Sequence, residues 1–218
     1  MRLLAARPER LALALAVLSW GWMLAHAMVA RRFACCAPAP AWPEDLLAWL
    51  AMIAAMMLPT KLAQLRDVAA RSYRARRVRA AVAYVLGYLA WWLALGIAAC
   101  LARQLGVLPG ATACALFAAA WVLVPARALW RRRCHRRIPL HPTTWRADLS
   151  AFHHGAAHGA PCAAMCWPMM IACAAANHHV AMMLACTVLV MFEARMLRPR
   201  RGPIIVGTLA IAALTLAL

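Results

Sequence analysis

The chain has 218 residues, of which 67% are hydrophobic and only 14% are charged. Soluble domains contain roughly 45–50% apolar residues, and so little polar surface could not cover a water-soluble globule. The composition therefore excludes a soluble enzyme, and it also excludes a disordered chain, which needs low hydrophobicity. The formal net charge of +18 would ordinarily indicate nucleic-acid binding, but the charges lie between long apolar runs. We therefore expect a multi-pass protein of the bacterial inner membrane.

Seven apolar segments are candidates for membrane spans, since a span needs about 20 mostly apolar residues. They lie near residues 11–30, 46–65, 80–102, 110–130, 160–176, 180–197 and 203–218. All should be helices, because an isolated strand would leave backbone groups without hydrogen bonds in hydrocarbon. The predicted fold class is thus all-α, a single transmembrane bundle over residues 1–218.

Residues 1–30 also resemble a signal peptide, because three arginines precede an apolar stretch that ends in small residues. The apolar run is long for a signal, and Arg31 and Arg32 follow it directly. These features favour an uncleaved first span, although the sequence leaves cleavage open.

Positive charge is distributed very unevenly over the connections between these segments. The N-terminus and the connections after the second, fourth and sixth segments hold 21 of the 24 Lys and Arg residues, and only Arg31, Arg32 and Arg103 fall elsewhere. The positive-inside rule then places the N-terminus inside and the C-terminus outside. The basic connections should contact anionic lipid headgroups. Nucleic acid is not an expected partner, because these connections lack the interleaved aromatic residues of such sites.

The segment 153–173, HHGAAHGAPCAAMCWPMMIAC, has the most informative pattern. A spacing of four residues places side chains on one face of a helix. That spacing relates His154, His158, Cys162 and Cys166, and the same face continues through Met170 to Cys173. Thiolates and thioethers select soft ions such as Cu(I), whereas hard cations prefer oxygen ligands. The segment therefore predicts a Cu(I) site, with zinc as a second candidate.

The alternative to a metal site is packing, since cysteine and methionine often fill cores without further function. Histidine in a span is harder to explain this way, because buried ionisable groups in membranes are functional candidates. Met56 and Met57 precede Pro59 in the second segment and are candidate softer ligands. Glu193 could pair with Arg195 or Arg198, or it could serve as a ligand or counter-ion. Packing is the expectation for Cys100, Cys114 and Cys134.

Two stretches resemble a family of bacterial integral membrane proteins catalogued as predicted metal-binding, otherwise a domain of unknown function. They are WLAMIAAMMLP at 49–59 and GAAHGAPCAAMCWPMM at 155–170. The likeness extends over about residues 45–200, and it includes Phe192, Glu193 and Pro199. It implies metal binding, with motif positions at His158, Gly159, Cys162, Cys166, Trp167, Met170, Met56, Met57 and Pro59. The chain departs from the family at Met165, where a further cysteine is frequent.

The leading hypothesis is a non-enzymatic Cu(I) carrier, transporter or metal-insertion factor. The expected ligands are Cys162 and Cys166, with His158 at the entry, Met170, Met56 and Met57 as a relay, and Glu193 as a charge partner. A membrane redox protein, using thiols or haem, is one alternative, and a scaffold subunit of a larger complex is another. Candidate partners are a metallochaperone, a larger membrane complex or a second copy of the chain.

Overall fold

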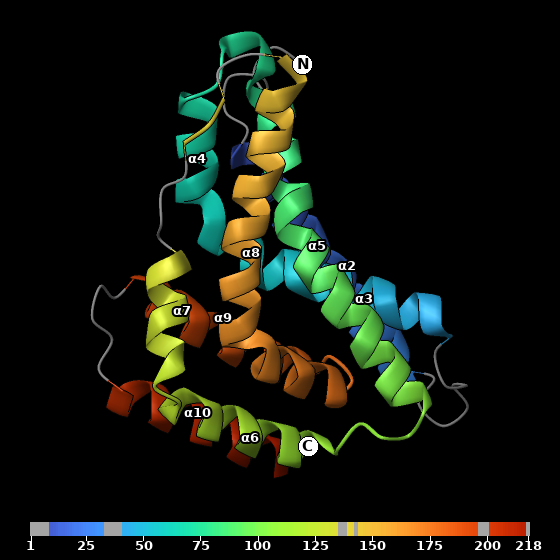
Figure 1. Cartoon of the computed structure of the whole chain (residues 1–218). Coiled ribbons are helices and arrows are strands. Elements are labelled where there is room, and N and C mark those ends of the chain that lie inside the picture. The colour runs from blue at the N-terminus through green and yellow to red at the C-terminus, as the bar shows by residue number, and fades with distance from the viewer. Residues whose placement is uncertain (1–8, 33–40, 135–138, 142–143, 196–200, 217–218) are drawn as a thin grey trace.

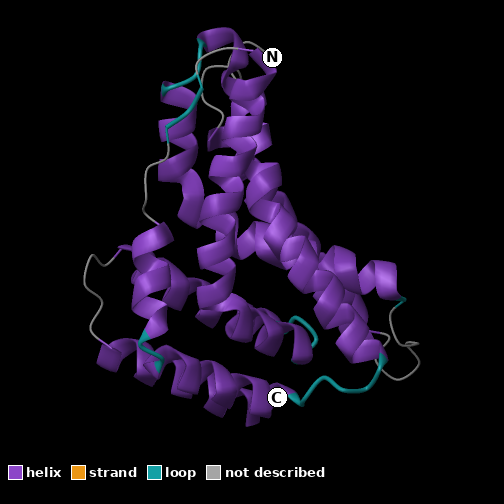
Figure 2. Cartoon of the chain, in the orientation of Figure 1, coloured by secondary structure: helices purple, strands orange, loops and turns teal. Residues whose placement is uncertain are grey.

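The computed structural model describes residues 9–32, 41–134, 139–141, 144–195 and 201–216 and is all-helical over them, as predicted (Figures 1 and 2). Arg2 and Arg7 of the basic N-terminus, and Pro199 of the motif, lie outside these residues. The α-helices are α2 (Glu9–Arg32), α3 (Trp42–Met57), α4 (Leu62–Ala70), α5 (Arg77–Gln104), α6 (Ala111–Leu123), α7 (Ala126–Cys134), α8 (Thr144–Ala175), α9 (Val180–Arg195) and α10 (Arg201–Leu216). Two short 3₁₀ turns, η1 (Leu58–Lys61) and η2 (Arg74–Arg76), precede α4 and α5.

Proline interrupts two of the segments that the sequence predicts as continuous helices. Pro59 lies in η1, so the predicted segment 46–65 becomes α3, a 3₁₀ turn and α4. Val124 precedes Pro125 and is extended, with φ −63° and ψ 121°, and so separates α6 from α7 within the segment 110–130. Both breaks occur at a proline, which lacks the N–H that a helix needs. Before Pro125 the backbone is also extended, as proline favours for the residue that precedes it, whereas Leu58 before Pro59 keeps helical dihedral angles.

Helix α8 tolerates Pro161 and Pro168 in its interior and is one helix of 32 residues. Pro168 cannot donate to the carbonyl of Ala164 four residues earlier. The indole N–H of Trp121 on α6 donates to that carbonyl instead, at 3.2 Å. Helix α8 begins at Thr144, well before the apolar segment 160–176 that the sequence gives as a candidate span.

The most extensive contact between two described helices is that of α5 with α8, and glycine allows their backbones to approach. A Cβ atom at Gly155 would collide with the backbone carbonyl of Tyr84, and one at Gly87 would collide with that of Phe152. Helix α8 therefore lies directly against the backbone of α5 (Figure 1). Helices α6 and α10 pack side by side across the lower end of α8 in this view.

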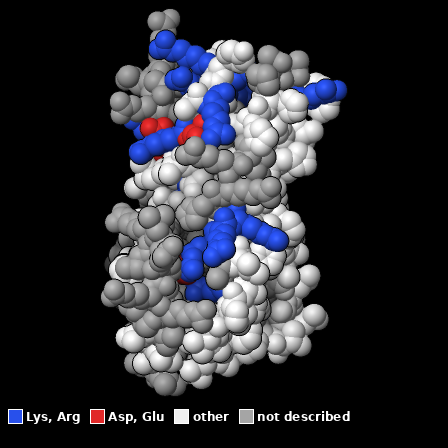
Figure 3. Space-filling view, turned by 60° about the vertical axis from the view of Figure 1, so that its left-hand side comes forward, with Lys and Arg blue, Asp and Glu red and all other residues white. Residues whose placement is uncertain are grey.

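Three helical stretches in the described part of the chain are long and apolar enough to cross a membrane. They are Glu9–Val29, Trp42–Ala70 and Arg74–Gln104, and two shorter apolar helices span Ala111–Leu123 and Val180–Glu193. Figure 3 shows the Lys and Arg side chains on the upper and middle parts of one face, above an uncharged lower part. On this face the charged side chains therefore lie above the uncharged part.

Candidate metal centre

The α5–α8 contact positions Tyr88 against the cysteines of α8. Gly159 brings the backbone of α8 next to the carbonyl of Tyr88. One turn further along α8, the Tyr88 hydroxyl lies 3.2 Å from Cys162 Sγ, within hydrogen-bonding distance. Both side chains are buried. The small residues that the sequence places between its ligands therefore have a structural role, because they let a hydroxyl reach a thiol.

Cys162 and Cys166 line a cavity of about 70 Å³. Cys134, from the end of α7, lines the same cavity, and so do Lys61 and Glu193. Lys61 is only 6% exposed, and its Nζ lies 5.6 Å from the centre of the Tyr88 ring. The cavity thus collects three thiols beside a buried ammonium group.

Glu193 lines the cavity and forms ion pairs with two arginines. Its Oε2 accepts a hydrogen bond from Arg127 at 2.6 Å, and its Oε1 lies 3.7 Å from Arg131. Glu193 and Arg127 are 4% and 6% exposed. The pairing uses α7, whereas the side chains of Arg195 and Arg198 lie outside the described residues. The carboxylate therefore acts as the counter-ion of Arg127, and the sequence-based choice of partner did not include α7.

His154 and His158 pack against each other on α8, in the turns that precede Cys162. Their ring centres are 4.6 Å apart, and the rings of His154 and His158 lie 5.7 and 5.9 Å from that of Tyr84. Each is 2% exposed. Burial lowers the pKa of His154, and it outweighs the opposing effect of Asp67. A neutral imidazole is the form that binds metals. Neither histidine lines the cavity that Cys162 and Cys166 share.

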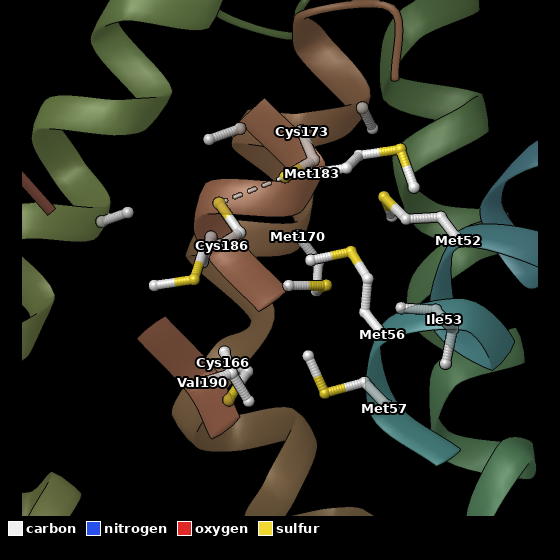
Figure 4. Close-up of a cluster of buried hydrophobic side chains, with 14 of the residues drawn as sticks. Met52, Ile53, Met56, Met57, Cys166, Met170, Cys173, Met183, Cys186 and Val190 are labelled. Atoms are coloured by element: carbon white, nitrogen blue, oxygen red, sulfur yellow. Dashed lines mark hydrogen bonds between the residues drawn. The ribbon is translucent and has the colours of Figure 1, made fainter. Parts of the chain in front are cut away.

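A cluster of buried sulfur atoms continues from the cavity along α8. Helix α3 supplies Met52, Met56 and Met57, helix α8 supplies Met169, Met170 and Cys173, and helix α9 supplies Met182, Met183 and Cys186. All are at most 6% exposed. Figure 4 shows thioethers of α3 facing those of α8 and α9, with Cys166 at one end of the group and Cys173 and Cys186 at the other. We call these nine residues the sulfur cluster.

The structure thus divides the predicted ligands into three sets. Cys162, Cys166 and Glu193 lie at the cavity; Met56, Met57, Met170 and Cys173 lie in the sulfur cluster; His154 and His158 lie together beside Tyr84. Among the described residues, no three His, Cys, Asp or Glu side chains converge in a geometry that could hold a metal ion. Any soft-metal site in this part of the chain must therefore include methionine or use two thiols.

The sequence patterns did not select three residues that line the cavity or contact its thiols. Cys134 was assigned to packing, although it lines the same cavity as Cys162 and Cys166. Tyr88 belongs to no motif or spacing in the sequence that would mark it as a partner of Cys162. Lys61 did have a signal, because it is the single lysine of the chain and lies inside a predicted span, where an ionisable residue is a functional candidate.

A family model described as PpoB2, copper chaperone, matches residues 46–217. This match runs from α3 to the end of α10, so it contains the cavity, the histidine pair and the whole sulfur cluster. Helix α2 lies before it. No curated protein and no solved structure matches the chain.

Proposed function

The chain belongs to the PpoB2 family of copper chaperones, and from this premise we propose that it is a multi-pass membrane protein that binds Cu(I) and passes it on. The observation that carries the proposal is the cavity with Cys134, Cys162 and Cys166 in its wall, which adjoins a buried cluster of thioethers. Thiolate ligands suit Cu(I) and zinc, and the thioethers beside them favour Cu(I). Carboxylate is scarce here, since the Glu193 carboxylate is bound by arginine.

Cys162 and Cys166 are the proposed thiolate ligands, and Met170, Met56 and Met57 are the softer ligands that receive the ion next. Lys61 offsets the negative charge that two thiolates bring into a buried site, which would be costly to leave uncompensated. Exchange of Cu(I) between sulfur ligands changes no oxidation state, so this function needs no catalytic acid, base or nucleophile. We therefore propose a carrier and not an enzyme.

His154 and His158 are the proposed entry ligands. They lie on the part of α8 that precedes the apolar segment 160–176, toward the end of the molecule that carries the ion pairs of Arg76 and Arg79 with Asp148. The Nδ1 atom of His154 has no hydrogen-bond partner among the described residues. An ion that reaches the imidazoles would be one helical turn from Cys162, since His158 precedes it by four residues.

Membrane integration rests on the apolar helices and on the distribution of charge. Three helical stretches have the length and composition of membrane spans. We propose that the remaining apolar helices also cross, giving seven spans with the N-terminus inside and the C-terminus outside in the bacterial inner membrane. The basic connections then face anionic headgroups. The partner that accepts the copper is a metallochaperone or a larger membrane complex.

Purified protein tests the proposal directly. Full-length chain, extracted in detergent without oxygen, is titrated with Cu(I) in competition with a chromophoric Cu(I) chelator. We expect binding to sulfur, visible by X-ray absorption, and the loss of about one bound ion per chain when Cys162→Ser is combined with Cys166→Ser. The matched control combines Cys100→Ser with Cys114→Ser, two buried thiols outside the cavity, and should bind like wild type. An unchanged stoichiometry in the Cys162 and Cys166 variant would remove this site from the proposal.

A further inference from the structure

Cys173 and Cys186 form a thiol pair between two helices at the far end of the sulfur cluster. Cys173 Sγ donates to Cys186 Sγ at 3.5 Å, and neither side chain has exposed surface. Sequence analysis placed Cys173 on the same helical face as Cys166 and did not pair it with Cys186. The structure instead joins Cys173 to Cys186 across the α8–α9 interface (Figure 4).

A strained turn holds the two helices in this register. Asn177 and His178 have positive φ angles of 50° and 55°, which few residues other than glycine adopt without cost. The N–H of His178 donates to the carbonyl of Cys173, which closes the end of α8. The chain then reverses, so that Cys186, six residues into α9, returns to the level of Cys173.

This pair cannot belong to the site of Cys162 and Cys166. Seven residues separate Cys166 from Cys173 on α8, which corresponds to roughly 10 Å along the helix. One metal ion cannot bridge that distance, because metal–thiolate bonds are about 2.3 Å in zinc sites and of similar length for other soft ions. Figure 4 shows Met56 and Met170 between Cys166 and the Cys173–Cys186 pair. The two pairs of cysteines are therefore separate, with thioethers between them.

The Cys173–Cys186 pair has the geometry of a two-thiol site. Two bonds of about 2.3 Å reach sulfur atoms up to roughly 4.6 Å apart, so the observed 3.5 Å suits a bent arrangement with a third ligand. Met170 lies one turn before Cys173, and Met183 lies one turn before Cys186. Both methionines are fully buried. The donor set is soft and contains no oxygen ligand, which is the chemistry that selects Cu(I).

We propose that Cys173 and Cys186 form a second Cu(I) site, distinct from the cavity site, with a neighbouring thioether as third ligand. The inference rests on the proposed copper-binding function and extends it from one ion to two. Loading the site replaces two S–H bonds with two Cu–S bonds and releases two protons to solvent, while copper stays Cu(I). The thioethers between the sites provide ligands for an ion that moves from one to the other.

The test compares stoichiometries of full-length protein in detergent without oxygen. Wild type should bind two Cu(I) ions per chain. The variant Cys173→Ser with Cys186→Ser should bind one, and so should Cys162→Ser with Cys166→Ser, while all four replacements together should bind none. Each double variant also tests its own folding, because it should still bind one ion at the site that was not changed. The control variant Cys100→Ser with Cys114→Ser should still bind two.

Other outcomes separate this inference from the function on which it rests. If wild type binds no Cu(I), the copper-binding function itself fails. If wild type binds one ion and Cys173→Ser with Cys186→Ser leaves that ion in place, the function stands and the second site is refuted. A disulfide between Cys173 and Cys186 that persists after reduction, seen as a mass lower by two hydrogens, would also overturn the inference, since the thiols would then be structural.

Discussion

Glu193 and Arg127 form the most deeply buried ion pair among the described residues, and its energetics decide what the site can tolerate. Removing two charges from water costs several kcal/mol per ion, and their attraction repays this only when the geometry is good. The contact between Arg127 and Glu193 Oε2, at 2.6 Å, provides such geometry, and Arg131 adds a weaker contact at 3.7 Å. The pair fixes α7 to α9, and with them Cys134 beside the cavity.

Glu193→Gln should therefore destabilise the protein by roughly 3 kcal/mol or more, because it leaves the Arg127 charge buried without a counter-ion. Replacing both partners, Arg127→Met with Glu193→Leu, should restore most of that loss. The measurement is the unfolding midpoint of purified protein in detergent. Arg79→Gln is the control: its contact with Asp148 Oδ2 is 2.8 Å, but Arg79 is 72% exposed, and such a pair contributes only about 0–1 kcal/mol. Equal losses for Glu193→Gln and Arg79→Gln would contradict the argument.

Residue spacing predicted which candidate ligands share one face of a single helix. A spacing of four residues was sufficient to select His158, Cys162, Cys166 and Met170, because α8 is helical throughout this region. It could not find Cys134, whose approach depends on the break at Pro125 and the direction that α7 takes after it. Nor could it pair Cys173 with Cys186, because that contact requires two non-glycine residues in a left-handed turn. Local periodicity predicts faces, and only tertiary structure shows which faces meet.

At the scale of the elements, the apolar segments of the sequence do not coincide with the helices of the structure. The first half of α8 contains Arg146, Asp148 and three histidines, so a search for apolar runs begins the segment at residue 160. A helix can extend beyond an apolar run, because helix formation depends on the propensity and packing of each residue and not on affinity for lipid. Here the polar half of α8 packs along α5 through Gly155 and so continues the helix to Thr144.

Gly155→Ala should test that packing, because its Cβ would collide with the carbonyl of Tyr84. Forcing a methyl group into a packed interface typically costs about 1–3 kcal/mol, and moving α8 away from α5 would also separate Tyr88 from Cys162. We expect a lower unfolding midpoint together with weaker Cu(I) binding.

Gly21→Ala on α2 is the matched control, since no atom lies within 4 Å of a Cβ there. Alanine favours a helix over glycine by roughly 0.5–1 kcal/mol, so this variant should be neutral or more stable. A Gly155→Ala protein as stable as the Gly21→Ala protein would mean that α5 and α8 do not pack so closely.

For the whole molecule, charge provides stronger evidence of orientation than helix length does. Ala111–Leu123 has 13 residues, about 20 Å of helix, which is shorter than a hydrocarbon core of roughly 30 Å. Length alone would therefore leave this helix undecided. The charges are more consistent, because the N-terminus and the connections after even-numbered segments hold 21 of the 24 Lys and Arg residues. A single miscounted crossing would move some of these arginines to the opposite side, against the positive-inside rule.

Seven crossings predict that the two ends of the chain lie on opposite sides of the membrane. Alkaline phosphatase fused after Leu218 should be active, because it folds only when exported, and a fluorescent protein at the same position should be dark. Fusions within residues 72–76, in the basic connection between α4 and α5, should give the reverse pattern. An even number of crossings would make the C-terminal fluorescent fusion bright. In that case a shorter apolar helix such as α6 would lie within the protein or along the membrane surface, and the basic segment after it would need another explanation than orientation.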